Sequence, residues 1–150
     1  MKGPFNLDRA EAMFTGGISN GFAGTAVSEA GDFDGDGIGD VLIGAPGSSA
    51  GASGRAYLVS GTIRGDVSLA GARALELEGE GTTDNAGFSV AGGGDADGDG
   101  LGDLLIGAPY ESSVRTQAGA AYLVLGGDGS GLVSLSAADA KLVGEFEVSI

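Results

Sequence analysis

A motif that occurs twice in this chain constrains its fold more than any other feature. Residues 32–46 read DFDGDGIGDVLIGAP, and residues 95–109 read DADGDGLGDLLIGAP. The offset of 63 residues between the two copies also aligns Gly24 with Gly87 without a gap. Self-similarity at a fixed period is typical of repeat architectures, in which each copy belongs to one supersecondary unit. We therefore expect two similar units, built around the two motifs.

Each unit contains four short segments with the composition of β-strands. They are residues 24–31, 40–45, 54–61 and 74–79 in the first unit, and residues 87–94, 103–108, 119–126 and 140–145 in the second. The second segment of each unit is an unbroken apolar run, which indicates burial on both faces. The proline that follows it cannot donate to a central ladder and ends the strand. A repeat of this size matches one four-stranded antiparallel sheet, the blade of a β-propeller, so we predict an all-β fold.

The same offset of 63 residues aligns residues 10–16 with the fourth strand segment of the first unit. This alignment predicts that the chain begins with the outer strand of another blade. The predicted organisation is then an outer strand of a preceding blade and its connection (10–23), a first blade (24–86), a second blade (87–145) and a tail (146–150).

The composition excludes several classes of protein. The 150 residues include 32 glycines without the three-residue period of collagen, and 42% of residues are hydrophobic, which disfavours disorder. There is no cysteine and no histidine. Their absence removes disulfides, Ser-His and Cys-His nucleophilic sites and ordinary zinc sites. We therefore predict that these residues do not form an enzyme.

The net charge is −14, from 21 acidic and seven basic residues, and the chain has no basic cluster. Such a chain is a poor partner for nucleic acid or for anionic membranes. No apolar run approaches the ~20 residues that span a bilayer, so we expect no membrane span. The first residues also lack the apolar stretch of a secretory signal peptide. Either the chain is not secreted by that route, or it is a piece of a longer protein.

The first aspartate-rich loop has the ligand spacing of an oxygen-only calcium site. Four carboxylates at relative positions 1, 3, 5 and 9 repel one another unless a hard cation lies between them. Their alternation lets a coiled turn point three carboxylates inward, and the intervening glycines permit the dihedral angles of that turn. The predicted ligands are the carboxylates of Asp32, Asp34, Asp36 and Asp40 and the main-chain carbonyl of Ile38.

The second loop repeats the same ligand pattern. Its predicted ligands are the carboxylates of Asp95, Asp97, Asp99 and Asp103 and the carbonyl of Leu101. An EF-hand would place a glutamate at position 12 and flank the loop with helices, but position 12 here is Ile43 or Ile106. A dockerin-like module would also need helices. We therefore expect two calcium ions, each held in a β-hairpin and each structural rather than catalytic.

These motifs resemble the FG-GAP repeats of integrin α-subunit β-propellers, which bacterial secreted and cell-surface proteins also carry. The second unit supplies Gly87 and Phe88 for the FG and residues 107–109 for the Gly-Ala-Pro. The first unit departs from the pattern, because Thr25 stands where phenylalanine is expected and Phe22 lies three residues earlier.

The resemblance covers residues 10–145 and implies a propeller of about six or seven blades. It also implies calcium between the first two strands of each blade and an extracellular adhesion role, with a protein or glycan ligand at a cell surface. Two blades cannot close a ring, so we expect further blades in cis, self-association of several copies, or a short open array. An alternative remains: the repeats are an accessory module of a secreted hydrolase whose catalytic domain is not in this chain.

The aromatic residues Tyr57 and Tyr122 lie at matching places in the third strands and are predicted to pack between blades rather than to bind ligand. Phe14 and Phe88 are predicted to be core residues. The polar loop after the second Gly-Ala-Pro, which contains Glu111, is longer than its counterpart, and loops of this kind carry function on rigid scaffolds. A solvated loop is the other interpretation.

Overall fold

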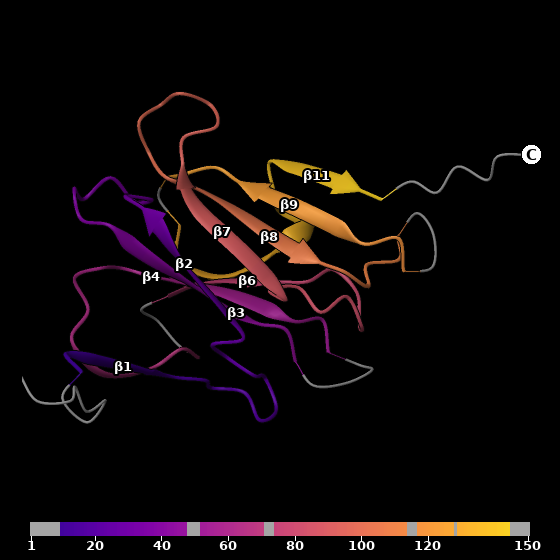
Figure 1. Cartoon of the computed structure of the whole chain (residues 1–150), viewed down its shortest axis with the longest axis horizontal. Coiled ribbons are helices and arrows are strands. Elements are labelled where there is room, and N and C mark those ends of the chain that lie inside the picture. Colours follow the sequence, from indigo (N-terminus) through magenta and orange to yellow (C-terminus); the bar gives the residue numbers. More distant parts are fainter. Residues whose placement is uncertain (1–9, 48–51, 71–73, 114–116, 128, 145–150) are drawn as a thin grey trace, which may run out of the picture.

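The computed structural model describes residues 10–47, 52–70, 74–113, 117–127 and 129–144. Over these residues the chain is all-β, with eleven strands and one short 3₁₀ turn at Leu135–Ala137 (Figure 1). Within the same residues no α-helix flanks either aspartate loop, so the EF-hand and dockerin-like alternatives do not apply. The predicted tail at 146–150 lies outside the described residues.

The eight strands predicted from the repeat are present, and the predicted fold class is confirmed. The first unit contains β2 (Ala26–Gly31), β3 (Asp40–Ala45), β4 (Arg55–Val59) and β6 (Ala74–Glu78), each antiparallel to the next. The second unit contains β7 (Ser89–Gly94), β8 (Asp103–Ala108), β9 (Ala120–Val124) and β11 (Ala140–Val143) in the same arrangement. Each unit is thus a four-stranded antiparallel meander.

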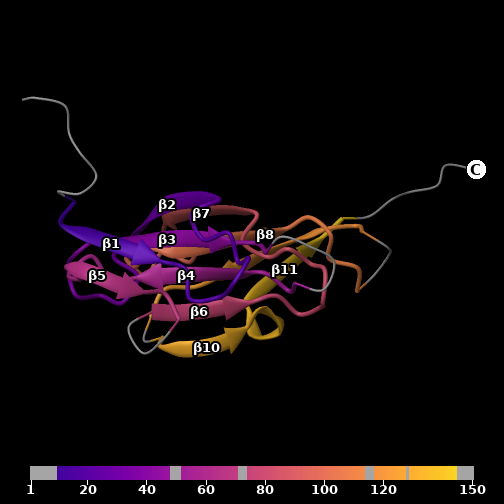
Figure 2. The ribbon, with the colours of Figure 1, turned by 90° about the horizontal axis from the view of Figure 1, so that it is seen from below.

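Two additional strands, β5 (Gly65–Ser68) and β10 (Gly131–Ser134), were not anticipated from the sequence. Strand β10 belongs to the second unit but pairs in parallel with β6, so the first sheet has five strands rather than four. Strand β5 pairs in parallel with β1 (Ala12–Thr15) in a separate two-stranded sheet, and Figure 2 shows both pairs. Each additional strand satisfies the backbone groups that an open sheet edge leaves unpaired.

The two parallel pairs have the same register. Gly131 lies opposite Leu75 in one pair, and Gly65 lies opposite Ala12 in the other. The repeat offset aligns Ala12 with Leu75. The pair of β1 with β5 is therefore equivalent to the pair of β6 with β10. The assignment of residues 10–23 to a preceding blade, and the other predicted boundaries, stay predictions.

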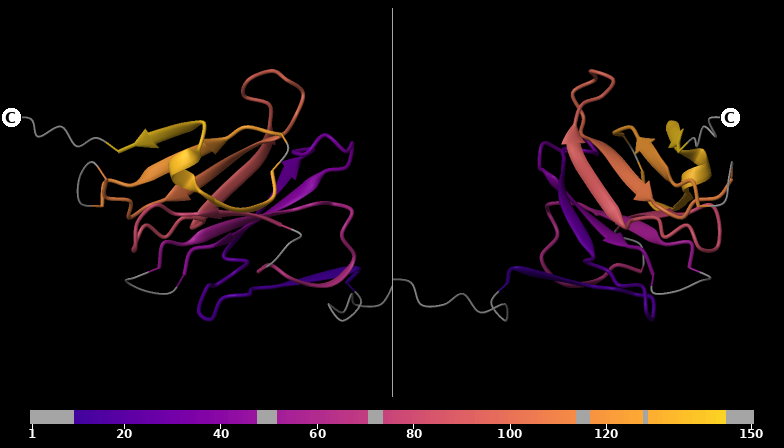
Figure 3. Two further views of the ribbon diagram at one scale, coloured as in Figure 1. Left: turned by 180° about the vertical axis from the view of Figure 1, so that it is seen from behind. Right: turned by 45° about the vertical axis from the view of Figure 1, so that its right-hand side comes forward.

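The sheets of the two units lie face to face, and the main hydrophobic core fills the space between them (Figure 3). The first unit contributes Leu42 and Leu77, and the second contributes Leu104, Ile106 and Tyr122, all fully buried. Burial of this apolar surface between two units is what repeat architectures use in place of a closed domain core.

A second core lies on the other side of the first sheet. It is formed by Ile43, Tyr57, Val59 and Leu69, with Phe14 of β1 packed against it. The apolar run of β3 is therefore covered on both faces, as its composition indicated. The two cores account for the burial of Tyr57 and Tyr122 at matching positions.

Glycines permit the two sheets to approach closely. A Cβ atom at Gly44 would lie 2.1 Å from the carbonyl oxygen of Gly87, which no real side chain tolerates. The inner strands also carry matching β-bulges, between Glu29 and Gly31 in β2 and between Gly92 and Gly94 in β7. Each bulge bends its strand directly before the aspartate loop.

One predicted core residue is misplaced. Phe88 is 52% exposed, although Phe14 packs against the second core. Phe88 directly precedes β7 at the turn where Gly87 brings the two sheets together, and its amide donates to the carbonyl of Asn85. The turn directs the Phe88 side chain outward, which the sequence pattern alone does not reveal.

Candidate metal centre

Each aspartate loop connects the first two strands of its unit. The first loop runs from the end of β2 at Gly31 to the start of β3 at Asp40, and the second runs from Gly94 to Asp103. Both loops follow a bulge and precede a strand that is packed in the core. The strands therefore fix the two ends of each loop, and local hydrogen bonds set the conformation between them.

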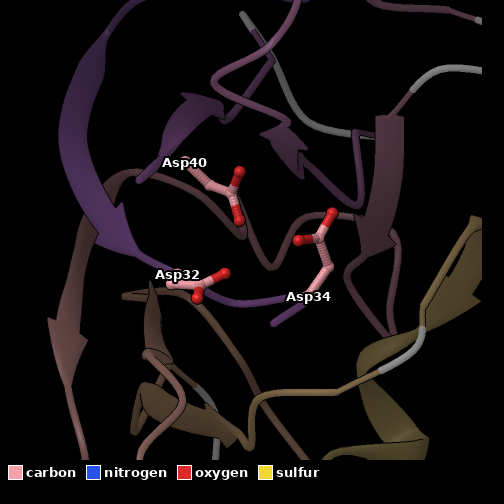
Figure 4. A group of neighbouring side chains, drawn as sticks. All are labelled: Asp32, Asp34 and Asp40. Carbon is pink, nitrogen blue, oxygen red and sulfur yellow. The ribbon is translucent and has the colours of Figure 1, made fainter. Parts of the chain in front are cut away.

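In the first loop three of the four predicted carboxylate ligands come together. One oxygen of each of Asp32, Asp34 and Asp40 lies within 4.8 Å of the others, and Figure 4 shows the three side chains pointing toward a common centre. Asp36 lies outside this group. Like charges at this separation destabilise one another, and a divalent cation between them would reverse the sign of that interaction.

Hydrogen bonds from the main chain coil the first loop. Asp34 Oδ1 accepts from the amide of Asp36 at 3.1 Å, and Asp36 Oδ1 accepts from the amide of Ile38 at 2.8 Å. These are consecutive Asx turns, in which an aspartate side chain replaces a backbone acceptor. Asp32 Oδ2 accepts from the amide of Gly37 at 2.9 Å, whereas Asp32 Oδ1 is buried without a protein partner.

The buried Asp32 Oδ1 is the observation that best fits a bound cation. Buried polar atoms are almost always hydrogen-bonded or coordinated, because an unsatisfied one costs about 1–3 kcal/mol. Calcium takes six to eight oxygen ligands, and three carboxylates offer up to six. The donor set contains only oxygen, which suits calcium rather than zinc or copper.

Asp40 connects the loop to the rest of its sheet. Its side chain is 3% exposed, Oδ2 accepts from the amide of Phe33 at 3.0 Å, and Oδ1 accepts from the amide of Gly61 at 3.1 Å. Burial raises the pKa of the Asp40 carboxyl, and the nearby charges of Asp34 and Asp36 add to that rise against these two hydrogen bonds. We refer to this bridging carboxylate as the latch of the loop.

The second loop has the same latch. Asp103 Oδ2 accepts from the amide of Ala96, and Asp103 Oδ1 accepts from the amide of Gly126 at 2.8 Å. Asp103 is buried like Asp40 and bridges the same two segments of its own unit.

The carboxylates that gather in the second loop are Asp95, Asp97 and Asp99, all of them exposed, with ligand atoms within 4.8 Å of one another. Asp103 lies outside this group. Both oxygens of Asp95 already accept main-chain hydrogen bonds, from Gly98 at 2.6 Å and from Gly100 at 3.0 Å. No buried carboxylate oxygen of the second loop is without a partner in the described part of the chain.

The structure thus brings together six of the ten predicted ligands, in two groups of three. Of the other four, Asp36 and Asp103 lie outside the groups. Ile38 and Leu101 donate their amides to the Asx turns of their loops, at 2.8 Å each, and their predicted carbonyl ligation stays a prediction. The complete ligand sets and the two calcium ions also stay predictions.

The first loop is covered by the second unit, which the sequence did not indicate. The carbonyl of Asp32 accepts from the amide of Gly102 at 2.9 Å, and the carbonyl of Phe33 accepts from the amide of Gly127 at 2.8 Å. Phe33 is 2% exposed and packs in the main core. The second loop has Ala96 at the position of Phe33. The sequence shows this difference, but only the structure shows that Phe33 packs in the core between the two units.

The polar loop after β8 contributes a buried ion pair. Glu111 is almost fully buried, and its Oε1 accepts from the amide of Ser113 at 2.6 Å and from Lys141 Nζ at 3.2 Å. Lys141 also contacts Glu80 of the first unit at 2.8 Å, so it links the two units. Its ammonium lies over the ring of Tyr122. These contacts give Glu111 a structural role.

The contacts of this ion pair shift the pKa values of both Glu111 and Lys141. Burial opposes ionisation of Glu111, but the hydrogen bonds from Ser113 and Lys141 together hold the pKa of its carboxyl below the ordinary value. Burial likewise opposes the charge of Lys141, and the carboxylates of Glu80 and Glu111 prevail and raise the pKa of its ammonium.

Comparison with known proteins agrees with the repeat architecture. A family model for the FG-GAP repeat matches residues 23–59 and residues 86–124, which contain the first three strands and the aspartate loop of each unit. The chain belongs to the FG-GAP repeat family. FG-GAP repeats are blades of β-propellers and are a non-catalytic, scaffold class of domain.

Two curated relatives are integrin α-chains. Integrin alpha pat-2 of Caenorhabditis briggsae is 38% identical over 87 residues, and integrin alpha pat-2 of Caenorhabditis elegans is 36% identical over 86 residues. Each match covers 57% of this chain but only 7% of the relative. The similarity therefore involves only a small part of each integrin chain. None of the helices found in the described ranges has the length and hydropathy needed to cross a bilayer.

Proposed function

We propose that these FG-GAP repeats bind two calcium ions and act as an extracellular scaffold for adhesion or ligand recognition. One observation carries the proposal. The same loop occurs in both units, with three carboxylates gathered in each, and in the first loop a buried carboxylate oxygen has no protein partner. Calcium would bind the gathered carboxylates and hold each loop against the sheet that follows it. In this role the ion is structural.

The similarity to integrin α-chains supports the proposed adhesion role. Extracellular calcium modules typically bind with dissociation constants of about 10⁻⁴–10⁻³ M, which suits a medium with millimolar calcium. The strongly acidic chain, with a net charge of −14, favours a protein or glycan ligand over nucleic acid.

The test is thermal unfolding with and without calcium. At millimolar calcium we expect each occupied site to stabilise the fold by roughly 0.5–1.5 kcal/mol. The double variant Asp34→Asn/Asp97→Asn removes one carboxylate from each group and should abolish the calcium-dependent shift in Tm. Asp66→Asn, at an exposed aspartate outside both loops, is the matched control and should keep the shift. An unchanged shift in the double variant would refute calcium binding by these loops.

A further inference from the structure

The outward surface of the second unit is apolar and exposed. Leu105 is 42% exposed and Leu142 is 60% exposed, whereas their counterparts in the first unit, Leu42 and Leu77, are fully buried against the second unit. Cross-strand register places both exposed leucines on one face of the sheet. We call this face the outer face of the second unit; it consists of Leu105, Ala121, Leu123, Ala140 and Leu142.

The chain itself shows what kind of surface covers such a face. The buried counterpart in the first unit packs against Leu104, Ile106, Ala108 and Tyr122 of the second unit. The matching positions in the first unit are Val41, Ile43, Ala45 and Tyr57, which are apolar as well and share the opposite face of its sheet. The first unit of a second copy therefore presents an apolar surface of the kind that could pack against the outer face of the second unit.

This opposite face of the first unit is only partly covered. Val27 of β2 is 66% exposed, whereas its counterpart Val90 in β7 packs against the main core. Phe14 of β1 and Leu69 pack on the rest of this face. Among the described strands, β1 pairs only with β5, so a single neighbour holds it in the sheet.

We propose that copies of this chain associate head to tail, with the outer face of the second unit of one copy docked on the opposite face of the first unit of the next. Strand β11 of the first copy replaces β1 and pairs in parallel with β5 of the next copy. The register of the two observed parallel pairs then sets Ala140 opposite Gly65 and Leu142 opposite Val67.

The proposal depends on the repeat geometry and not on calcium binding. The two surfaces differ from each other, so the interface is heterologous, and such interfaces build rings or open arrays rather than closed dimers. In the isolated chain β1 then pairs with β5, and in the assembly β11 of another copy takes the place of β1. Deleting residues 1–16 should strengthen the association, because β11 no longer competes with β1 for β5.

The first experiment measures the mass of the full chain by size-exclusion chromatography with light scattering over a series of concentrations. The mass should rise beyond that of two copies as concentration increases. Leu142→Glu and Val27→Glu each disable one of the two surfaces, and each should stay monomeric. An equimolar mixture of the two variants retains one intact pair of surfaces and should form a complex that stops at two copies. Tyr110→Glu, at a loop residue of similar exposure, should behave as the wild type.

Three results would overturn the proposal: a wild type that is monomeric at every concentration, a dimer that neither variant disrupts, or variants that do not combine when mixed. A monomeric wild type would leave the outer face to further blades of a longer chain. Leu105→Glu is a second substitution on that face and must reproduce the result of Leu142→Glu. Far-UV circular dichroism and melting curves of each variant check that it is folded.

Discussion

The two aspartate loops have nearly the same sequence but different surroundings. The first is covered by the second unit, which buries Phe33 and hydrogen-bonds the carbonyl of Asp32, and it contains a buried oxygen without a partner. The second gathers three exposed carboxylates, and both oxygens of Asp95 already accept main-chain hydrogen bonds. A motif therefore encodes the coil of the loop, and the neighbouring blade determines how far that coil is preorganised for a cation.

The largest expected effect comes from removing the residue that anchors the covered loop. Phe33→Ala should lower the free energy of unfolding by about 3–4 kcal/mol, because it opens a cavity in the main core. Ala96→Gly truncates the equivalent position of the second loop and should cost less than about 1 kcal/mol. Urea denaturation measures both values. Equal costs at the two positions would show that the second unit does not hold the first loop in the way described.

The latch should be equally important in both loops, since its hydrogen bonds are the same. Asp40→Ala and Asp103→Ala each remove both oxygens that accept from two backbone amides, and each should cost about 2–3 kcal/mol. Denaturation in the presence of a chelator separates this cost from any lost calcium binding. If one of the two substitutions proved nearly neutral, the shared latch would not be a common structural element of the units.

The two units also differ in the ion pair near their outer strands. In the first unit Arg55 contacts Glu76 and Glu78, whereas in the second Lys141 contacts Glu111 and reaches Glu80 across the interface. The second pair therefore links the two units, whereas the first pair lies within one unit.

Acid should weaken the pair formed by Glu111 and Lys141. Because the folded-state pKa of Glu111 is depressed, its contribution is complete above about pH 4.5 and is lost as the pH falls through the folded-state value. Glu111→Gln should cost about 1–2 kcal/mol at neutral pH and progressively less in acid. Unfolding of the wild type and the variant from pH 7 to pH 3 tests this prediction. A difference between them that stays constant with pH would contradict it.

The sequence predicted the features that depend on local pattern. The eight strands, both loops and the burial of Tyr57 and Tyr122 follow from apolar runs, glycines and the repeat offset. Strands β5 and β10 were not predicted, because four residues carry little periodic signal and their partners, β1 and β6, are far away in the sequence. The sequence Val-Ser-Leu, which occurs at 67–69 and again at 133–135, was the signal that could have predicted these two strands.

Sequence spacing also did not predict which aspartates gather in each candidate metal group. The spacing gave four equivalent carboxylates in each loop, but the structure groups Asp40 with the first set and leaves Asp103 outside the second. Each latch aspartate is already bound to backbone amides of two segments, so small differences in loop position decide whether its oxygen reaches the group. Sequence spacing does not contain that information.

The most direct test of this account is a calcium titration of the chelator-treated chain by calorimetry, repeated with Asp34→Asn and with Asp97→Asn. We expect two unequal sites, with the covered first loop binding about tenfold tighter, equivalent to about 1.4 kcal/mol. Asp34→Asn should remove the tighter site and Asp97→Asn the weaker one. The absence of binding to a folded chain, or loss of the tighter site in Asp97→Asn, would contradict the account.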